Sequence, residues 1–324
     1  MNNAEYKERV KLLLELLPKV VEIDDFAVHG GTAINLFVLD LPRYSIDIDL
    51  TYIPVQPREE TFLKLRKNLT LLKQSIKKHI PKIVIEEKPN KLLCTYNGIL
   101  VKIEANGTKR GLIEPPIVMP LCKLAQMEFK TFCEAKLVSI SQLYGGKITA
   151  ALDRQHPRDL FDIKLMFNFI NDFEQVKKGF FYCLLGGDRP IVESLAPNRT
   201  DQSETLEKQF SGMTDIPFSY EDYKNTREKL IEFVNASLTQ KDKDFLIDFE
   251  AGNSLSRHIE YQEFLKFPSV QWKQLNIDKL KISNPMKHKQ GIERLTQWLA
   301  MNNQMNLTNS EGDTPNCALN ALLK

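Results

Sequence analysis

The sequence predicts an α/β (α+β) fold in its first half and a helical second half. Strand-like apolar runs alternate with amphipathic helices up to about residue 170, and beyond it the apolar positions recur at helical spacing. Asn97-Gly98 joins two of these strand-like runs and is a strong signal for a type I′ hairpin. With 324 residues, the chain can form one large domain or two ordinary ones, each with its own hydrophobic core.

Composition indicates a globular protein rather than a membrane or secreted one. The chain is 42% hydrophobic and 27% charged, which is ordinary for a globular protein. No apolar run approaches the roughly 18 residues of a transmembrane helix, and residues 1–5 lack a signal-peptide pattern. The five cysteines are scattered without C-x-x-C spacing, which favours free thiols over disulfides or a zinc site. We therefore expect a cytoplasmic protein with no membrane partner.

Apolar periodicity and breaker residues place the elements of the first half. The first helix is expected to end before Pro18, Ser141 to cap a helix over 142–152, and Pro157 to open the next helix. Helices are expected at residues 4–17, 32–39, 58–79 and 142–152, and strands at 26–28, 45–52, 82–86, 92–96 and 99–105.

Two glycines followed by two carboxylates form the most informative motif. Gly30-Gly31 allows close approach of the backbone to a ligand, and a helix that starts at Thr32 would direct N–H groups at a phosphate. On the following strand, Asp47 and Asp49 share one face and lie about 7 Å apart, a spacing that suits a pair of divalent cations. Each motif alone is common in turns and on solvated strands. Together they indicate a site for a nucleoside triphosphate and metal ions.

A third carboxylate follows the Asn97-Gly98 hairpin. On the strand 99–105, Lys102 and Glu104 share one face, opposite the aliphatic residues. Glu104 at the end of a neighbouring strand would complete a metal site with Asp47 and Asp49. The alternative from spacing alone is an exposed glutamate on an edge strand.

A second group of charged residues follows in the helices after residue 140. Lys147 falls among apolar positions and therefore needs an anion or an exit to water. Arg154 and Arg158 follow it, and Asp159 shares a helix face with Asp162 at i, i+3. Snorkelling of an isolated lysine is the alternative explanation for Lys147.

The charge of the chain is concentrated in one stretch. Residues 61–110 contain twelve Lys or Arg against three Glu, a net charge of +9. A basic region next to a phosphate-handling site suggests a polyanionic acceptor such as RNA. The alternative is a solvated, lysine-rich helix face, because the stretch has no strong run of aromatic residues interleaved with its lysines.

These residues resemble the AbiEii/AbiGii family of nucleotidyltransferase-like toxins, from bacterial type IV toxin–antitoxin and abortive-infection systems, in the DNA polymerase β-like superfamily. The glycine and aspartate pairs belong to the whole superfamily, whereas the Lys147 and Arg158-Asp159 segments narrow the resemblance to this family. The matching segments are Val28–Ala33, Arg43–Leu50, Lys102–Glu104, Gly146–Leu152 and Arg154–Asp162, with a weaker echo at Leu238–Leu246.

The resemblance implies a fold, a reaction and site residues. It implies a nucleotidyltransferase core (1–168) with a mixed twisted sheet flanked by helices, then a helical C-terminal domain (169–301); the polar tail 302–324 is expected to be disordered. The reaction would transfer a nucleotidyl group from an NTP and release pyrophosphate, using Mg²⁺ (or Mn²⁺). The implied roles are triphosphate or nucleotide binding by Gly30, Gly31, Thr32, Ser45, Lys147, Arg154 and Arg158, metal binding by Asp47, Asp49 and Glu104, and catalysis by Asp47, Asp49, Glu104, Lys147 and Asp159.

Three functions compete at this point. The first is a toxin that modifies RNA, with tRNA as the expected acceptor and a cognate antitoxin as partner. The second is a transferase of the same fold that modifies a protein or small molecule, which a basic stretch facing away from the carboxylates would support. The third is a non-catalytic GTP- or nucleotide-binding protein. The three acids and Lys147 argue against the third, since a scaffold has no chemical need for them.

Overall fold

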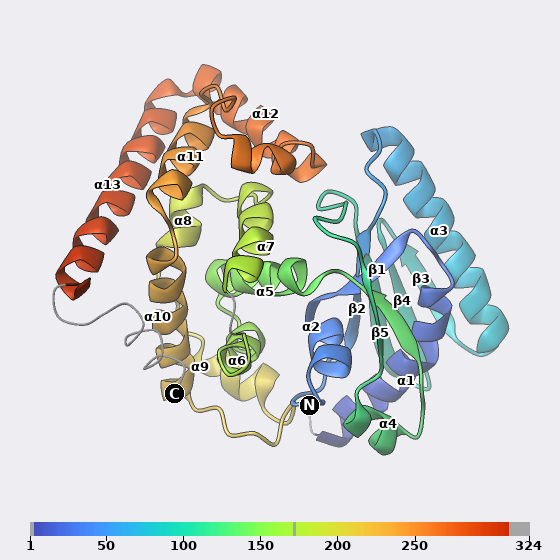
Figure 1. The fold of residues 1–324 in the computed structure, drawn as a ribbon. Coiled ribbons are helices and arrows are strands. Elements are labelled where there is room, and N and C mark those ends of the chain that lie inside the picture. Colours follow the sequence, from blue (N-terminus) through green and yellow to red (C-terminus); the bar gives the residue numbers. More distant parts are fainter. Residues whose placement is uncertain (1–2, 171–172, 311–324) are drawn as a thin grey trace. The chain divides into compact units, whose positions relative to one another are not determined.

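The computed structural model describes residues 3–170 and 173–310 (Figure 1). The chain forms two compact units, the first made of Met1–Gly146 and Ser203–Phe218 and the second of the remaining residues. The boundary therefore falls inside one helix, and a later segment of the chain returns to the first unit. The domain boundary placed at residue 168 from the sequence stays a prediction.

The first unit is built on a mixed seven-stranded sheet, which confirms the predicted fold class. The strand order is β3-β4-β5-β2-β1-β7-β6; β2 pairs parallel with β5 and antiparallel with β1. Its strands are β1 (Phe26–His29), β2 (Asp47–Tyr52), β3 (Val84–Lys88), β4 (Lys91–Tyr96), β5 (Ile99–Asn106), β6 (Ile117–Pro120) and β7 (Glu134–Leu137). Its helices are α1 (Asn3–Val21), α2 (Gly30–Ala33), the π-helical η1 (Ile34–Val38), α3 (Arg58–His79), α4 (Lys123–Phe129), α9 (Ser203–Thr205) and the π-helical η2 (Leu206–Phe210), and α5 (Ile140–Arg154) continues into the second unit.

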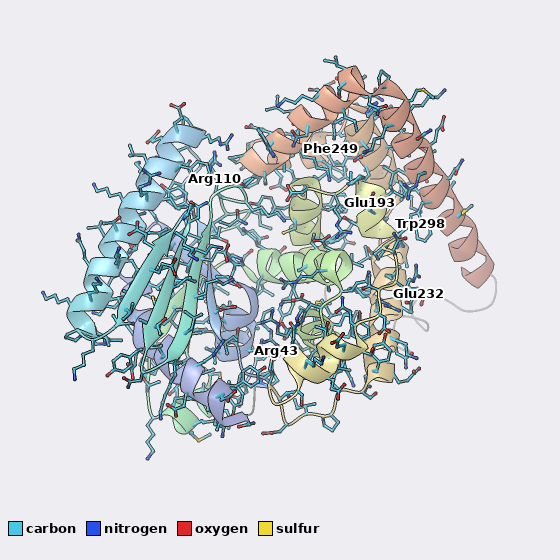
Figure 2. The ribbon with its side chains drawn as sticks, turned by 180° about the vertical axis from the view of Figure 1, so that it is seen from behind. Arg43, Arg110, Glu193, Glu232, Phe249 and Trp298 are labelled. Carbon is cyan, nitrogen blue, oxygen red and sulfur yellow. The ribbon has the colours of Figure 1, made fainter. Side chains whose placement is uncertain are left out.

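The two faces of this sheet have opposite chemistry. Ile48 and Leu50 of β2 and Ile103 of β5 are completely buried, and the side chains between them in sequence point to the other face. Helices α2 and α3 lie on opposite sides of the sheet (Figures 1 and 2). Asp49 adjoins Gly30, the first residue of α2. The carboxylate face is therefore the α2 face, and α3 covers the apolar face.

The hairpin predicted from Asn97-Gly98 is confirmed. Both residues have positive φ, 48° at Asn97 and 78° at Gly98, as a type I′ turn requires. The turn joins β4 to β5 and pairs Lys91 with Glu104 at the far end of the ladder. The Asn97-Gly98 turn thus sets the register of β4 and β5, and this register fixes the position of Glu104 in the sheet.

Three predicted helix starts or ends are wrong. Helix α1 continues past Pro18 to Val21, because Leu16, Leu17 and Val20 are buried and their packing outweighs the backbone hydrogen bond that proline removes. The cap of α5 is Ser139, whose hydroxyl accepts a hydrogen bond from the Gln142 N–H, rather than Ser141. Helix α2 begins at Gly30 and not at Thr32.

The second unit is helical in its described residues. Capping boxes at Ser219–Asp222 and Thr239–Asp242 start two of its helices. The indole N–H of Trp298, a residue labelled in Figure 2, donates to Asn235. Its helices are α6 (Pro157–Met166), α7 (Phe173–Leu185), α8 (Ile191–Leu195), α10 (Tyr220–Ala236), α11 (Gln240–Ala251), the 3₁₀ helix η3 (Ile259–Phe264), α12 (Pro268–Ser283) and α13 (Pro285–Ser310). Helix α13 thus includes the first residues of the tail predicted to be disordered, and residues 311–324 lie outside the described residues.

Candidate functional site

The three predicted carboxylates lie on two adjacent strands of the first unit. Asp49 on β2 is in register with Glu104 on β5, and Asp47 is in register with Lys102. Residues in register on parallel strands point to the same face. Glu104 is on a strand next to that of Asp49, as the sequence predicted, and the parallel pairing brings the two residues level and places a lysine beside Asp47.

Lys102 forms ion pairs with two of the three carboxylates, Asp47 and Glu104. Its Nζ lies 2.9 Å from Glu104 Oε2 and 4.0 Å from Asp47 Oδ2. The hydrogen bond from Lys102 lowers the pKa of Glu104. Burial opposes a charge on Lys102, but Glu104, Asp47 and Asp49 outweigh it, so the pKa of Lys102 is raised. Lys102 was predicted to share the face of Glu104 but was not among the predicted site residues, although the alternation along this strand was the available signal.

Asp47 and Asp49 suit a hard divalent cation, since Mg²⁺ is usually held by one or two carboxylates together with substrate phosphates. Within residues 3–170 and 173–310, however, no group of three or more His, Cys, Asp or Glu side chains has the spacing to hold a metal ion. The donor chemistry therefore fits a cation that is held partly by substrate oxygens. The three carboxylates alone do not form a metal site.

The glycine pair lies directly against this face. A Cβ on Gly30 would be 2.7 Å from Asp49 Oδ2, and a Cβ on Gly31 would be 2.8 Å from Arg43 Nη2. Gly30 also has φ +71°, a conformation that strongly favours glycine. The guanidinium of buried Arg43 (Figure 2) therefore lies at the glycine turn. Arg43 is the first residue of the segment Arg43–Leu50, which resembles the family, but it was not among the predicted site residues.

Thr32 and Ser45 connect the glycine turn to β2. The Thr32 hydroxyl lies 3.0 Å from Ser45 Oγ and also contacts the Asp47 carbonyl oxygen. Both side chains are buried. In this structure the two hydroxyls hold the turn against the carboxylate strand, and their predicted contact with a nucleotide stays a prediction.

Gly30→Ala is expected to inactivate the protein more than it destabilises it. A left-handed φ costs an alanine about 1–2 kcal/mol, and the new Cβ would displace Asp49. Gly98→Ala is the matched control, because Gly98 has φ +78° and, apart from Gly98 and its two chain neighbours, no atom of the described residues lies within 4 Å of the position that its Cβ would take. Chemical unfolding should show similar costs for both variants, and nucleotide-transfer assays should show a loss only for Gly30→Ala. Equal activity in both variants would contradict the assigned role of Asp49.

The other predicted residues form a separate group in the second unit, on α5 and α6. Lys147 Nζ lies 2.8 Å from Asp159 Oδ1 and 2.9 Å from Asp162 Oδ2, and all three side chains are buried. Arg154 Nε lies 2.6 Å from Asp159 Oδ2. Burial raises the pKa of Asp159, but Lys147 and Arg154 outweigh it and hold that pKa well below its usual range. The anion that Lys147 needs is thus supplied by two aspartates, and snorkelling is not the explanation.

Arg154 and Arg158 are the less buried cations of this group. The side chain of Arg154 is 55% exposed, although its guanidinium is held by Asp159. Arg158 is partly exposed, and its backbone N–H donates to His156 at the start of α6. Asp162, which shares Lys147 with Asp159, was recognised only as a neighbour on the helix face.

The basic stretch is divided between the two faces of the sheet. Helix α3, with six of the twelve basic residues, lies opposite the carboxylates. Lys91 and Lys88 instead continue the row of Asp49 and Glu104 across β4 and β3, since Lys88 pairs with Lys91 and Lys91 with Glu104. Only a minority of the predicted positive charge therefore faces the carboxylates.

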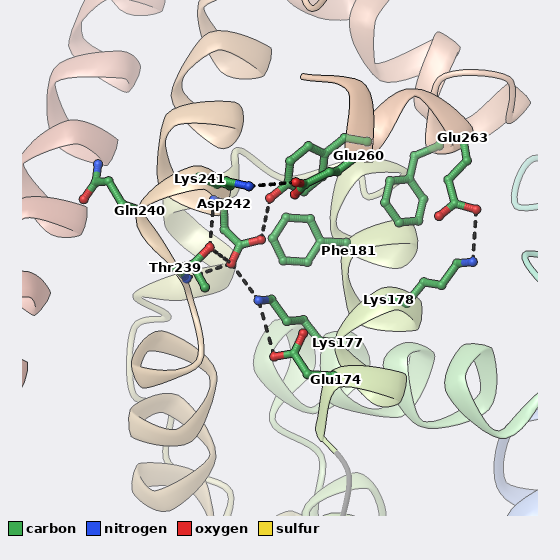
Figure 3. A pocket seen from close by; sticks show the side chains of 12 residues that line it. Glu174, Lys177, Lys178, Phe181, Thr239, Gln240, Lys241, Asp242, Glu260 and Glu263 are labelled. Atoms are coloured by element: carbon green, nitrogen blue, oxygen red, sulfur yellow. Dashed lines mark hydrogen bonds and ion pairs between the residues drawn. The ribbon is translucent and has the colours of Figure 1, made fainter. Parts of the chain in front are cut away.

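The weaker motif at Leu238–Leu246 lines a pocket of about 570 Å³ in the second unit (Figure 3). Asp242 Oδ2 lies 2.7 Å from Lys177 Nζ, and the Tyr261 hydroxyl donates to Asp242 Oδ1. Around them, Lys241 pairs with Glu260 and Lys178 with Glu263. These ion pairs and the capping box at Thr239 give the motif a structural role in joining α7, α11 and η3.

Comparisons with known proteins identify the family and the fold of this chain. A protein-family model, "Nucleotidyl transferase AbiEii toxin, Type IV TA system", matches residues 11–185. Among solved structures, MenT4, nucleotidyltransferase toxin Rv2826c from Mycobacterium tuberculosis H37Rv, matches with a TM-score of 0.57 and 14% sequence identity, over 85% of this chain and 93% of that one. A search of curated proteins found no significant match. None of the described helices is long and apolar enough to cross a membrane.

Proposed function

Because this chain belongs to the AbiEii family of nucleotidyltransferase toxins of type IV toxin–antitoxin systems, we propose that it transfers a nucleotidyl group from an NTP to an RNA acceptor. The expected acceptor is tRNA, the cation Mg²⁺ (or Mn²⁺), and the released product pyrophosphate. The observation that carries the proposal is the position of Asp49, between the glycine turn at Gly30 and Glu104 on β5. A triphosphate at the turn would thus lie beside the carboxylates.

The residues of the first unit divide the chemistry between them. Gly30 and Gly31 leave room for phosphate oxygens, and Arg43 supplies a positive charge beside them. Asp47 and Asp49 would hold the cation, which when bound lowers the pKa of the attacking hydroxyl and neutralises the leaving pyrophosphate. Glu104 would act as a third ligand or as the base that accepts the proton of the acceptor hydroxyl.

The second group would stabilise phosphate charge. We propose that Lys147, Arg154 and Arg158 supply positive charge to the triphosphate, since electrostatic stabilisation dominates phosphoryl transfer. Arg154 is the most exposed cation of its ion-pair cluster. Asp159 would position both Lys147 and Arg154, because it bonds to each of them.

An RNA acceptor is supported by the lysines on the carboxylate face. Lys91 and Lys88 lie in the same cross-strand row as Asp49 and Glu104, so an anionic backbone that reaches Glu104 would cross them. We further propose a cytoplasmic location and a cognate antitoxin as partner. A neighbouring gene for a small winged-helix antitoxin would support the partner assignment.

One observation favours a second candidate function, transfer to a protein or small molecule. Helix α3 carries half of the basic residues of the 61–110 stretch on the face opposite the carboxylates. An acceptor without a long anionic backbone would not need them near the site. A decisive assay must therefore offer both kinds of acceptor.

The test is incubation of the protein with each labelled NTP and Mg²⁺, with total tRNA or with a cell extract free of nucleic acid. We expect label on tRNA and release of pyrophosphate, both abolished by a chelator. Label on protein or small molecules would favour the second candidate. Binding of nucleotide without any transfer would contradict both and indicate a non-catalytic nucleotide-binding protein.

A further inference from the structure

We propose that Lys102 holds the place of a divalent cation among Asp47, Asp49 and Glu104, so that the nucleotide-free protein binds free metal weakly. The ammonium and the metal would compete for the same carboxylate oxygens. This inference rests on the proposed function, because it assigns a cation to these carboxylates. It makes Lys102 a positioning residue that links metal binding to nucleotide binding.

The contacts of Lys102 carry the proposal. Lys102 is opposite Asp47 in the parallel ladder of β2 and β5, and Glu104 follows two residues later on the same face. Its Nζ reaches both carboxylates, at 2.9 Å from Glu104 Oε2 and 4.0 Å from Asp47 Oδ2. The chain itself therefore supplies a positive charge that holds these acids together.

Lys102 is also free to leave by rotation of its side chain. Its side chain is 32% exposed, about as much as those of Asp47 and Glu104. A partly exposed ion pair between a lysine and a carboxylate contributes only a modest free energy, so little is lost when it breaks. A triphosphate that enters with its cation offers the ammonium new anionic partners, so Lys102 can exchange a carboxylate for a phosphate.

Electrostatics sets the direction of the effect. A lone divalent cation that approaches Asp47 meets the charge of Lys102 at short range, and the repulsion disfavours binding. A cation that arrives on a triphosphate brings excess negative charge, and the same lysine then attracts the complex. Metal affinity should therefore be low without nucleotide and high with it.

Lys91 offers a matched comparison on the neighbouring strand. Its Nζ lies 3.7 Å from Glu104 Oε1, and its side chain is 35% exposed. It thus resembles Lys102 in exposure and in its contact with Glu104. Lys91 lies on β4, however, and β5 separates that strand from Asp47 and Asp49 on β2, so its removal should change metal binding little.

The experiment measures Mn²⁺ binding by electron paramagnetic resonance in the full chain, with and without a nonhydrolysable NTP analogue. Without nucleotide, Lys102→Met should bind Mn²⁺ at least about tenfold more tightly than wild type, and Lys91→Met should stay within about threefold. Lys102→Arg, which keeps the charge, should bind like wild type. The analogue should strengthen Mn²⁺ binding in wild type and much less in Lys102→Met.

Equal or weaker Mn²⁺ binding by a folded Lys102→Met variant would overturn the inference, because the lysine would then not compete with metal. Adding Asp49→Asn to Lys102→Met should remove the gain in affinity; a retained gain would also overturn it, since the metal would lie elsewhere. Circular dichroism checks that each variant is folded. Failure of the proposed function is distinguishable, because it appears as absent transfer in wild type, whatever Lys102→Met does to Mn²⁺ binding.

Discussion

Asp49→Asn is expected to lower the rate of nucleotidyl transfer by at least about 10³-fold, equivalent to roughly 4 kcal/mol of transition-state stabilisation. Asparagine keeps the size of the side chain but removes the negative charge that would hold the cation. Asp49 lies at the glycine turn and in register with Glu104, so no other carboxylate can take its position. The measurement is incorporation of labelled nucleotide into the acceptor under single-turnover conditions.

The control for Asp49 makes the same substitution at an exposed position. Asp244→Asn removes a charge from helix α11, where Asp244 accepts a hydrogen bond from Gln240 on the protein surface, and it should leave transfer unchanged. Both variants should unfold at close to the wild-type temperature. Wild-type transfer by a folded Asp49→Asn protein would eliminate the metal-binding role of Asp49 and, with it, the proposed site.

Lys147→Met is expected to destabilise the second unit by about 3–5 kcal/mol, because it would leave buried carboxylates without their shared cation. Asp159 and Asp162 are both within 2.9 Å of Lys147, and all three side chains are 6% exposed or less. Arg154 contacts Asp159 and would compensate in part. Urea unfolding followed by circular dichroism measures the change.

An exposed ion pair provides the control for Lys147. Lys164 pairs with Asp222 at 2.7 Å, with both side chains more than a third exposed, and Lys164→Met should cost no more than about 1 kcal/mol. Combining Lys147→Met with Asp162→Asn should recover part of the lost stability. A folded Lys147→Met protein of wild-type stability but without transfer activity would instead show that Lys147 acts on the phosphates and contributes little to the fold.

The local part of the site follows from the sequence alone. The alternation that puts Asp47 and Asp49 on one face and the Asn97-Gly98 turn depend on neighbouring residues, and both appear as predicted. Their physical basis is local, since the pleat of a strand and the φ preferences of asparagine and glycine act within a few residues. The end of α1 was predicted wrongly for the complementary reason, because distant packing partners outweigh the effect of Pro18.

What the sequence by itself determined is therefore which residues are candidates for a functional role: the glycine turn, three acids and, as a second group, the charged residues around Lys147. Only the tertiary structure decided their partners. Long-range pairing of β2 with β5 placed Lys102 among the acids. Buried Lys147 forms ion pairs with two aspartates. Packing of the apolar side of α3 places half of the basic residues of the 61–110 stretch on the face opposite the carboxylates. The physical reason is that ion pairs and strand pairings join residues far apart in the chain, and their geometry depends on the packing of the whole sheet and not on sequence spacing.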